Sequence, residues 1–158
     1  MNRLQKFLIV IAAGWMMGGG PKKDKKFINK VYKQIIEGNK TLNVVNDKLG
    51  TPTYTFDFAN NVKLLVENEY WGLYNMVCEG MTSRLEVARE LLSLLNLNSY
   101  IDIKEVSSDY FRDEYFAARP ESERLINKKL NLRKVNIMRN WKIALKEYVE
   151  GYFNINNK

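Results

Sequence analysis

The chain contains no histidine and only one cysteine, Cys78, among its 158 residues. Without histidine, the Ser-His-Asp and Cys-His arrangements of nucleophilic catalysis are excluded, so any proton transfer would fall to Tyr, Lys, Asp or Glu. We expect no metal site, because Cys78 would be the only soft ligand for zinc. A single cysteine also excludes an intramolecular disulfide, which suits a reducing, cytoplasmic environment.

The motifs that bind nucleotide cofactors are also missing. Glycines 18–20 follow an expected strand and precede an expected helix, but they have neither G-x-G-x-x-G nor G-x-x-x-x-G-K-[ST] spacing. Tyr74 has Cys78 four residues on and Tyr148 has Tyr152, so we expect no catalytic Tyr-x-x-x-Lys pair in this chain. We therefore expect no catalytic residue, no bound cofactor and no hydride transfer by this chain alone.

The longest apolar run, residues 7–17, is too short to span a membrane. Together with the basic N-terminus before it, this run has the length of a secretory signal peptide. Against secretion, Trp15 interrupts the run, and three glycines and a lysine cluster stand where a cleavage site with small residues would be. A buried parallel strand over 7–11 that opens into a glycine-rich loop explains the same residues. We favour the strand and keep the signal peptide as the alternative.

The composition indicates one folded domain with a basic surface. Hydrophobic residues make up 46% of the chain and aromatic residues 12%, which is enough to bury a core. The net charge of +7 indicates anionic partners. The basic residues gather at 22–33 and 124–146. A nucleic-acid-binding module would also need exposed aromatic residues, and most aromatic residues here fall on the apolar faces of expected helices. We therefore expect a phosphate-bearing ligand and no nucleic acid.

Helical and extended patterns alternate along the chain and predict one α/β unit. Ser83 and Glu86 match a capping box, and Thr55 and Asn140 are expected N-caps. Asp57 in a first helical turn favours the helix dipole. The apolar face of that helix is expected to be Phe58, Ala59, Val62, Leu65 and Val66. Strands are expected at 7–11, 41–46, 72–78 and 100–106. Helices are expected at 27–36, from the cap at Thr55 to about 66, from the cap at Ser83 to about 95, at about 122–130 and at 141–149.

Five blocks carry a family resemblance when they are taken in order. They are AGWMMGGG (13–20), VVNDKLGTPTYTFDFA (44–59), GLYNMVCEGMTSRLEVARELL (72–92), ARPESERLINKKL (118–130) and MRNWKIALKEYV (138–149). Together they resemble the C-terminal, substrate-binding half of the dTDP-4-dehydrorhamnose reductase family, within the extended short-chain dehydrogenase/reductase group. The resemblance covers nearly the whole chain.

The resemblance implies a single sugar-nucleotide-binding domain over 1–158. Residues 1–20 would form the last Rossmann strand and a glycine-rich loop, and residues 21–158 the substrate lobe. The fold class would be α/β with an incomplete Rossmann sheet. The N-terminal NADP-binding half, which carries the glycine fingerprint and the Tyr-Lys pair in the family, is expected to be absent. The intact family enzyme uses NADPH.

The resemblance also implies substrate-binding residues. Trp15 matches a tryptophan that packs against the sugar, although core packing is the alternative. Three positions earlier the family usually has Arg where this chain has Ala12. Arg119 matches an arginine that faces the nucleotide diphosphate, for which a guanidinium fork is well suited; the alternative is a surface loop residue. Lys26 and Lys48 are weaker phosphate candidates.

The connector Gly-Thr-Pro-Thr (50–53) lies near the substrate cleft in the family. Pro52 restricts the geometry of the connector, so the Thr53 hydroxyl either faces a polar ligand or completes a rigid turn.

These implications define the expected partners and the open alternatives. The expected ligand is a dTDP-hexose, and no membrane is expected to be involved. The incomplete sheet predicts exposed strand edges, with either self-association or a partner that supplies the Rossmann half. The alternatives to a reductase half are an epimerase or dehydratase fragment, and a non-catalytic binding or regulatory protein of the same family.

Overall fold

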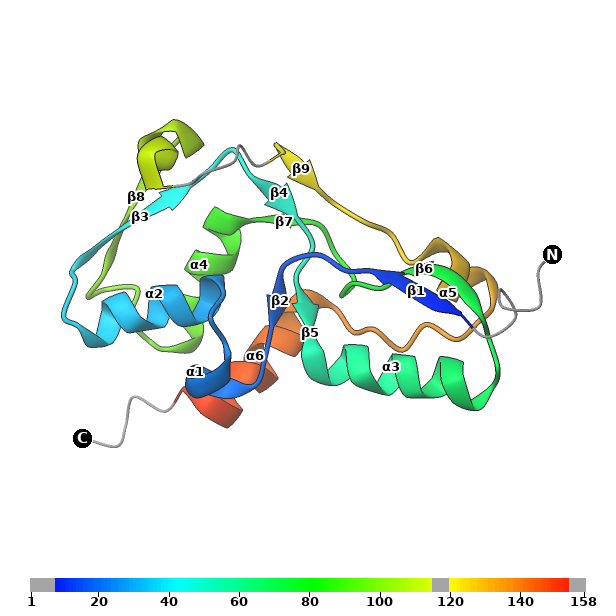
Figure 1. Ribbon diagram of the computed structural model, residues 1–158. Coiled ribbons are helices and arrows are strands. Elements are labelled where there is room, and N and C mark those ends of the chain that lie inside the picture. The colour runs from blue at the N-terminus through cyan, green and yellow to red at the C-terminus, as the bar shows by residue number, and fades with distance from the viewer. Residues whose placement is uncertain (1–7, 115–119, 154–158) are drawn as a thin grey trace.

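The computed structural model describes residues 8–114 and 120–153, which fold into a mixed α/β domain (Figure 1). The helices are α1 (Gly20–Lys23), α2 (Phe27–Ile36), α3 (Thr55–Glu67), α4 (Arg84–Leu94), α5 (Lys128–Leu132) and α6 (Trp141–Tyr152), with a 3-10 segment at Ser108–Glu114. The strands are β1 (Ile9–Ala12), β2 (Met16–Met17), β3 (Thr41–Val45), β4 (Leu49–Gly50), β5 (Thr53–Tyr54), β6 (Gly72–Asn75), β7 (Thr82–Ser83), β8 (Asp102–Val106) and β9 (Ser122–Glu123).

These strands form four small sheets. β1 pairs in parallel with β6, β2 with β5, and β3 with β8. β4 is the central strand of the fourth sheet, antiparallel to β7 and parallel to β9. A two-stranded sheet is marginally stable alone, so each pair needs a covering layer. Helix α4 packs on β3, α6 on β5 and α5 on β6.

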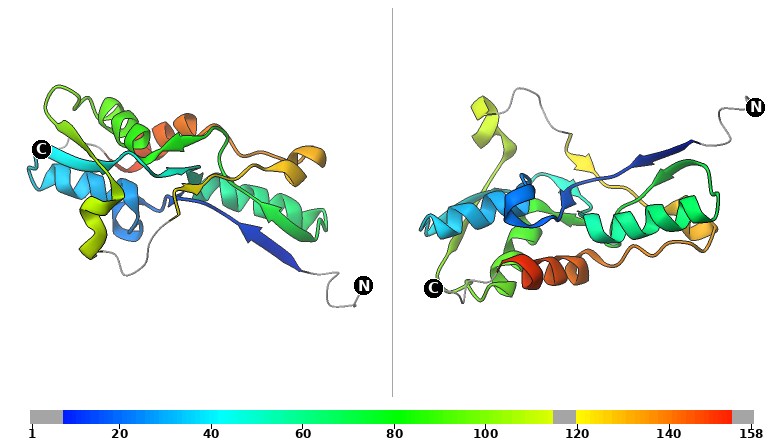
Figure 2. Two further views of the ribbon diagram at one scale, coloured as in Figure 1. Left: turned by 90° about the horizontal axis from the view of Figure 1, so that it is seen from above. Right: turned by 60° about the horizontal axis from the view of Figure 1, so that its bottom comes forward.

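The layers are arranged along an elongated molecule (Figures 1 and 2). The β3–β8 pair lies at one end with α2 and α4, and the β1–β6 pair lies at the other end with α3 and α5. Helix α6 and the short strands β2 and β5 lie between them. One hydrophobic cluster runs through these layers, and its large buried members include Leu42, Tyr74, Leu91 and Tyr148. No helix within the described residues is both long and apolar enough to cross a membrane.

Several local predictions are confirmed by this structure. The backbone N–H of Glu86 donates to Ser83 Oγ at 3.1 Å and Glu86 Oε2 accepts from Ser83 N at 2.9 Å, which completes the capping box of α4. Asn140 caps α6, because its side-chain oxygen accepts from Lys142 N at 3.0 Å. The strand expected over 7–11 is present and parallel over residues 9–12, but it is not buried as predicted, because Val10 and Ala12 are exposed.

The predicted face of α3 is confirmed in part. Leu65 is buried, and Phe58 and Val62 pack against the core. Ala59 and Val66 are exposed instead, and the polar residues Asp57 and Asn61 are buried. These two polar residues have partners in the chain before α6. Asp57 binds Arg139, and the Asn61 amide donates to the carbonyl of residue 135 and accepts from the backbone N–H of residue 137. These bonds satisfy the buried polar groups.

Three further predictions need correction. Tyr54, not Thr55, occupies the N-cap position of α3, and no side-chain hydrogen bond caps this helix. The strand predicted over 72–78 ends at Asn75, although residues 76–78 stay buried. The helix predicted from about 122 begins at Lys128, because residues 122–123 pair with β4 as strand β9.

Candidate functional site

The backbone around Trp15 is fixed by two neighbouring strands. Trp15 lies between β1 and β2, and its carbonyl accepts a hydrogen bond from Thr53 N at 3.0 Å. β2 continues this contact by pairing in parallel with β5. The glycine at 14 packs closely here, since a Cβ atom on it would lie 2.8 Å from the carbonyl oxygen of Thr51. The turn that carries Trp15 is therefore locked onto the connector 50–53.

The indole of Trp15 is held by three further residues. Its Nε1–H donates to Glu123 Oε2 at 2.8 Å. The guanidinium carbon of Arg84 lies 4.4 Å from the centre of the indole and 4.9 Å from the centre of the Phe27 ring. Gly50 lies against the indole so closely that an added Cβ would be 2.2 Å from a ring carbon. Trp15 is half-buried in this setting, so part of its surface stays accessible.

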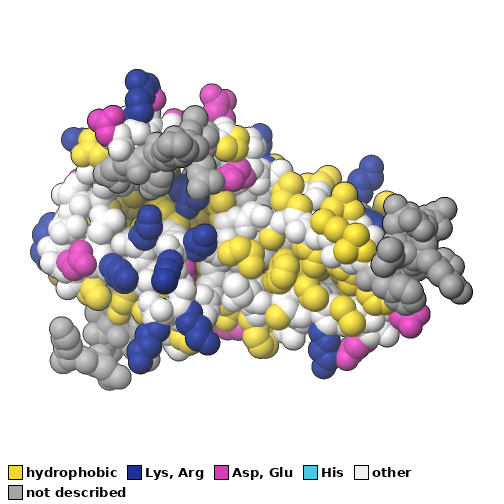
Figure 3. Space-filling view, viewed as in Figure 1, with side chains coloured by type: hydrophobic (Ala, Val, Ile, Leu, Met, Phe, Trp, Pro, Cys, Tyr) yellow, Lys and Arg dark blue, Asp and Glu magenta, His cyan; other side chains and the backbone are white. Residues whose placement is uncertain are grey.

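The two predicted lysines, Lys26 and Lys48, belong to segments that meet at Arg84. Lys26 is exposed, immediately precedes Phe27, and its backbone N–H donates to Asp24 Oδ1 at 2.7 Å. Lys48 is half-buried, and its carbonyl accepts from Arg84 N at 3.3 Å. Figure 3 shows Lys and Arg side chains gathered over α1 and α2 on this half of the molecule. The structure thus brings the indole and a group of cations to one region.

The structure does not test a ligand contact for the other two predicted residues, Thr53 and Arg119. Thr53 is fully buried, and its hydroxyl has no hydrogen-bond partner. A ligand could reach that hydroxyl only if neighbouring atoms moved, so its contact with a ligand stays a prediction. Arg119 lies outside the described residues, and its role also stays a prediction.

Sequence reasoning missed the roles of Arg84 and Glu123, and it placed Gly50 in the connector without expecting its contact with the indole. Glu123 was assigned to a helix, and its role depends on the β4–β9 pairing, where Gly50 and Glu123 lie opposite each other. Arg84 did carry a local signal. It is the first residue of α4, where a positive side chain opposes the helix dipole, so an arginine there needs compensation from elsewhere in the fold.

An ion-pair network lies beside β5. Arg139 donates to Asp57 from Nε and Nη2, with the Nη2–Oδ1 distance 2.6 Å, and it also pairs with Glu147. The hydrogen bond from Arg139 lowers the pKa of Glu147. Burial, followed by the charge of Glu147, raises the pKa of Tyr54 to about 12. The network braces α3 against α6.

The cysteine thiol and the buried Tyr148 hydroxyl are unsuited to catalysis. Burial raises the pKa of the Cys78 thiol to about 12, so the thiol stays protonated and is a poor nucleophile. Burial also raises the pKa of Tyr148, whose hydroxyl donates to Asp24. Catalytic acids and bases usually have a pKa shifted towards neutrality. Among the described residues, the resolved shifts all move away from it. Those residues also contain no cluster of carboxylates and thiols that could hold a metal ion.

One tyrosine does have a lysine four residues on, so the expectation that this spacing is absent was wrong. Tyr100 and Lys104 have it. Tyr100 precedes β8 and Lys104 lies within that strand. Four residues of strand span about 13 Å, against about 6 Å for one turn of helix. The extended backbone therefore keeps this pair from acting as a phenol with an adjacent ammonium.

The assembled site suits binding. A fixed aromatic ring can pack on the apolar face of a sugar, and nearby lysines and an arginine can attract phosphate oxygens. A profile of the RmlD substrate binding domain matches residues 2–153. The chain belongs to the RmlD substrate binding domain family.

Individual RmlD-family relatives agree with this membership. The chain is 28% identical over 137 residues to the dTDP-4-dehydrorhamnose reductase of Mycobacterium tuberculosis, covering 86% of this chain and 43% of the relative. It resembles the solved dTDP-4-dehydrorhamnose reductase of Yersinia enterocolitica with a TM-score of 0.82 and 32% identity, covering 92% of this chain and 50% of that one. The Bacillus anthracis reductase, solved in complex with NADP, shares the fold at a TM-score of 0.76 and 23% identity, covering 90% of this chain and 48% of that one. This RmlD-family chain therefore spans about half the length of the relatives it matches.

Proposed function

We propose that this chain is the nucleotide-sugar-binding half of a dTDP-4-dehydrorhamnose reductase-like oxidoreductase. Its ligand is a dTDP-hexose, and the complete enzyme reduces a 4-keto sugar with NADPH during the synthesis of dTDP-rhamnose-type precursors. The observation that carries the proposal is the fixed indole of the half-buried Trp15, which lies where the segments of Lys26 and Lys48 meet. Family membership supports the choice of ligand.

The test has a binding arm and a turnover arm. In the binding arm, the chain is titrated by calorimetry with dTDP-rhamnose and, separately, with dTDP. We expect weak, saturable binding that is lost in Trp15→Ala, whereas Trp71→Ala, at a second half-buried tryptophan, keeps it. In the turnover arm, NADPH oxidation is followed with a dTDP-4-keto-6-deoxyhexose. We expect no oxidation, because the chain has no cofactor motif. The absence of saturable binding, or measurable turnover, would contradict the proposal.

The partner of this half is the part of the family fold that the chain does not span. β1 is hydrogen-bonded to β6 only, so its other edge is unpaired within the described residues. Parallel sheets are normally covered on both faces, but Val10 and Leu73, which lie opposite each other, are 46% and 63% exposed. Figure 3 shows apolar side chains gathered on this half of the molecule.

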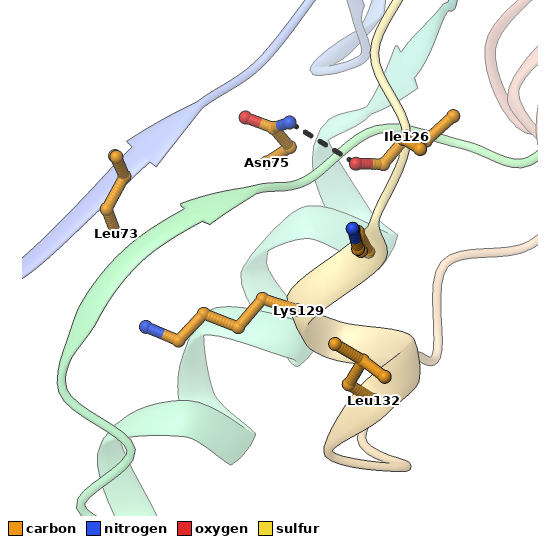
Figure 4. Close-up of a pocket in the computed structure, with 6 residues that line it drawn as sticks. Leu73, Asn75, Ile126, Lys129 and Leu132 are labelled. Carbon is orange, nitrogen blue, oxygen red and sulfur yellow. Dashed lines mark hydrogen bonds between the residues drawn. The ribbon is translucent and has the colours of Figure 1, made fainter.

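A surface hollow of about 260 Å³ extends this apolar face. It lies between β6 and α5 and is lined in part by Leu73, Ile126 and Leu132, while Asn75 donates to the carbonyl of Ile126 across it (Figure 4). Lys129 also reaches towards β6 here. Because the relatives are about twice as long as this chain, their remaining half is the occupant that fits a free parallel edge.

Co-expression tests this partner. The chain is produced together with the part of the Yersinia enterocolitica reductase that it does not match. We expect a one-to-one complex by light scattering, and we expect Val10→Lys to prevent it. Ile143→Lys on α6, which places the same charge at a similarly exposed isoleucine, is expected to leave it intact. A homodimer of this chain that Val10→Lys dissociates would contradict the assignment, as would a complex that Val10→Lys does not affect.

A further inference from the structure

We propose that Arg84 is a positioning residue, which holds the indole of Trp15 in its ligand-binding orientation before the ligand arrives. The inference rests on the function proposed above, because it takes the indole to be the surface on which the sugar packs. Arg84 acts through Trp15 and was not among the substrate-binding residues expected from the sequence.

The geometry that supports this role is a stack of three side chains. The Arg84 guanidinium carbon is 4.4 Å from the centre of the indole and 4.9 Å from the centre of the Phe27 ring. Both distances are within the range of cation–π attraction. Phe27 begins α2 and Arg84 begins α4. The stack therefore ties the indole to the starts of two helices that come from distant parts of the sequence.

Two other residues, Glu123 and Gly50, contact the indole. The hydrogen bond to Glu123 restrains the Nε1 edge of the ring, at 2.8 Å, and Gly50 packs against the ring without a side chain. A single hydrogen bond at one edge allows a ring to tilt about that bond. The guanidinium, held against the ring by Phe27, opposes such a tilt.

The position of Arg84 in its helix indicates that something beyond local stability selects it. A cation in the first turn opposes the helix dipole, and the N-terminus of α4 is already satisfied by the capping box of Ser83 and Glu86. Residues that oppose a local preference, as this cation opposes the helix dipole, are often found where the fold builds a functional site. In this fold Arg84 lies over two aromatic rings.

Pre-ordering of the indole has a measurable consequence. A ligand that must immobilise a mobile side chain binds more weakly by the entropy of that ordering, which for one large side chain corresponds to roughly two- to tenfold in Kd. We therefore expect Arg84→Ala to raise the Kd for dTDP-rhamnose about fivefold. The effect should persist in 0.5 M NaCl, because at that ionic strength long-range attraction between a distant cation and a diphosphate is largely screened.

The experiment pairs this variant with a matched control. Arg133 also lies over aromatic rings, at 4.9 Å from Tyr70 and 5.7 Å from Tyr74, on a different part of the chain. Arg133→Ala removes the same charge and the same type of contact, and we expect it to bind dTDP-rhamnose as the unmodified chain does. Arg84→Lys keeps the charge but loses the planar group that stacks between two rings, so we expect it to remain weakened.

A second readout reports on the indole without any ligand. The chain is labelled with 5-fluorotryptophan, and the Trp15 resonance is assigned with Trp15→Phe. We expect Arg84→Ala to shift the Trp15 fluorine signal and change its linewidth, and we expect Arg133→Ala to leave it in place. An unchanged Trp15 signal in Arg84→Ala would overturn the inference, as would wild-type affinity in Arg84→Lys or a defect that 0.5 M NaCl removes. If the unmodified chain binds no dTDP-rhamnose, the proposed function fails, while the ligand-free signal still decides whether Arg84 orders the indole.

Discussion

Replacing Gly50 with alanine should disrupt the Trp15 site through a single added methyl group. A Cβ at position 50 would lie 2.2, 2.3 and 2.7 Å from three carbons of the indole, whereas ordinary contact begins at 3.4 Å. The ring would therefore have to move by at least about 1.2 Å, the difference between 3.4 and 2.2 Å. The backbone of Gly50 is outside the left-handed region, so alanine adds no backbone strain there.

The cost follows from the contacts that such a movement breaks. A shift of this size takes the Trp15 Nε1–H out of range of Glu123, which removes a hydrogen bond worth about 1 kcal/mol. It also displaces the indole relative to Arg84, which disturbs a cation–π contact worth about 0.5–1 kcal/mol. We expect Gly50→Ala to lower the free energy of unfolding by about 2 kcal/mol, in the range found for overpacked sites.

Urea denaturation followed by circular dichroism measures this change, and Gly151→Ala is the control. A Cβ at position 151 would meet nothing within 4 Å, and the residue lies in α6. Alanine is a better helix former than glycine by about 0.5–1 kcal/mol, so the same substitution should stabilise the protein there. If Gly50→Ala were as stable as the unmodified chain and kept its tryptophan fluorescence, the packing argument for Trp15 would be wrong.

Three further predictions concern the core and the termini of helices. Asp57→Ala leaves Arg139 without its buried partner and should lower the free energy of unfolding by about 2–3 kcal/mol, less than for a fully buried pair because Arg139 is partly exposed. The pKa of Glu86 is lowered by its hydrogen bonds, that from the Thr82 hydroxyl foremost. Its stabilising contribution is therefore present above pH 4.5, its ordinary pKa, and is lost as the pH falls through its lower folded value. In urea titrations at several pH values, Glu86→Gln should therefore lose less of its free energy of unfolding as the pH falls than the unmodified chain does. Cys78, buried and with a pKa of about 12, should react with a thiol reagent only at the rate at which the protein opens.

For each of these three predictions, one result would contradict it. Asp109→Asn breaks an exposed pair with Arg112 and should change stability by less than 0.5 kcal/mol, about the typical value for a surface ion pair; an Asp57→Ala effect that small would refute the bracing role of the network. If Glu86→Gln lost stability with falling pH as steeply as the unmodified chain, the group responsible for that loss would not be Glu86. Rapid labelling of Cys78 under native conditions would show that the thiol is accessible.

The parts of the fold that could be predicted from the sequence depend on short-range patterns. The capping box at Ser83 and the cap at Asn140 are made by neighbouring residues, so their spacing alone locates the starts of α4 and α6. The apolar run that contains β1 leads into three glycines, which favours a strand that opens into a loop. In these segments local propensity and tertiary packing favour the same structure.

The parts that could not be predicted depend on partners far along the chain. The burial of Asp57 and Asn61 on α3 was missed because it depends on partners more than 70 residues away along the chain. β9 has only two residues and exists because β4 lies beside it. In the site, Trp15, Lys26 and Lys48 were identified through a family resemblance, whereas Arg84 and Glu123 became visible only when the fold brought them to the indole.

The most direct test of the central claim is to watch the Trp15 indole while a nucleotide sugar is added. In a chain labelled with 5-fluorotryptophan, titration with dTDP-rhamnose should shift the Trp15 signal in a saturable way. The signals of Trp71 and Trp141 should move less. A titration that leaves Trp15 unmoved, or that shifts only the other two tryptophans, would show that the sugar nucleotide does not bind at this indole.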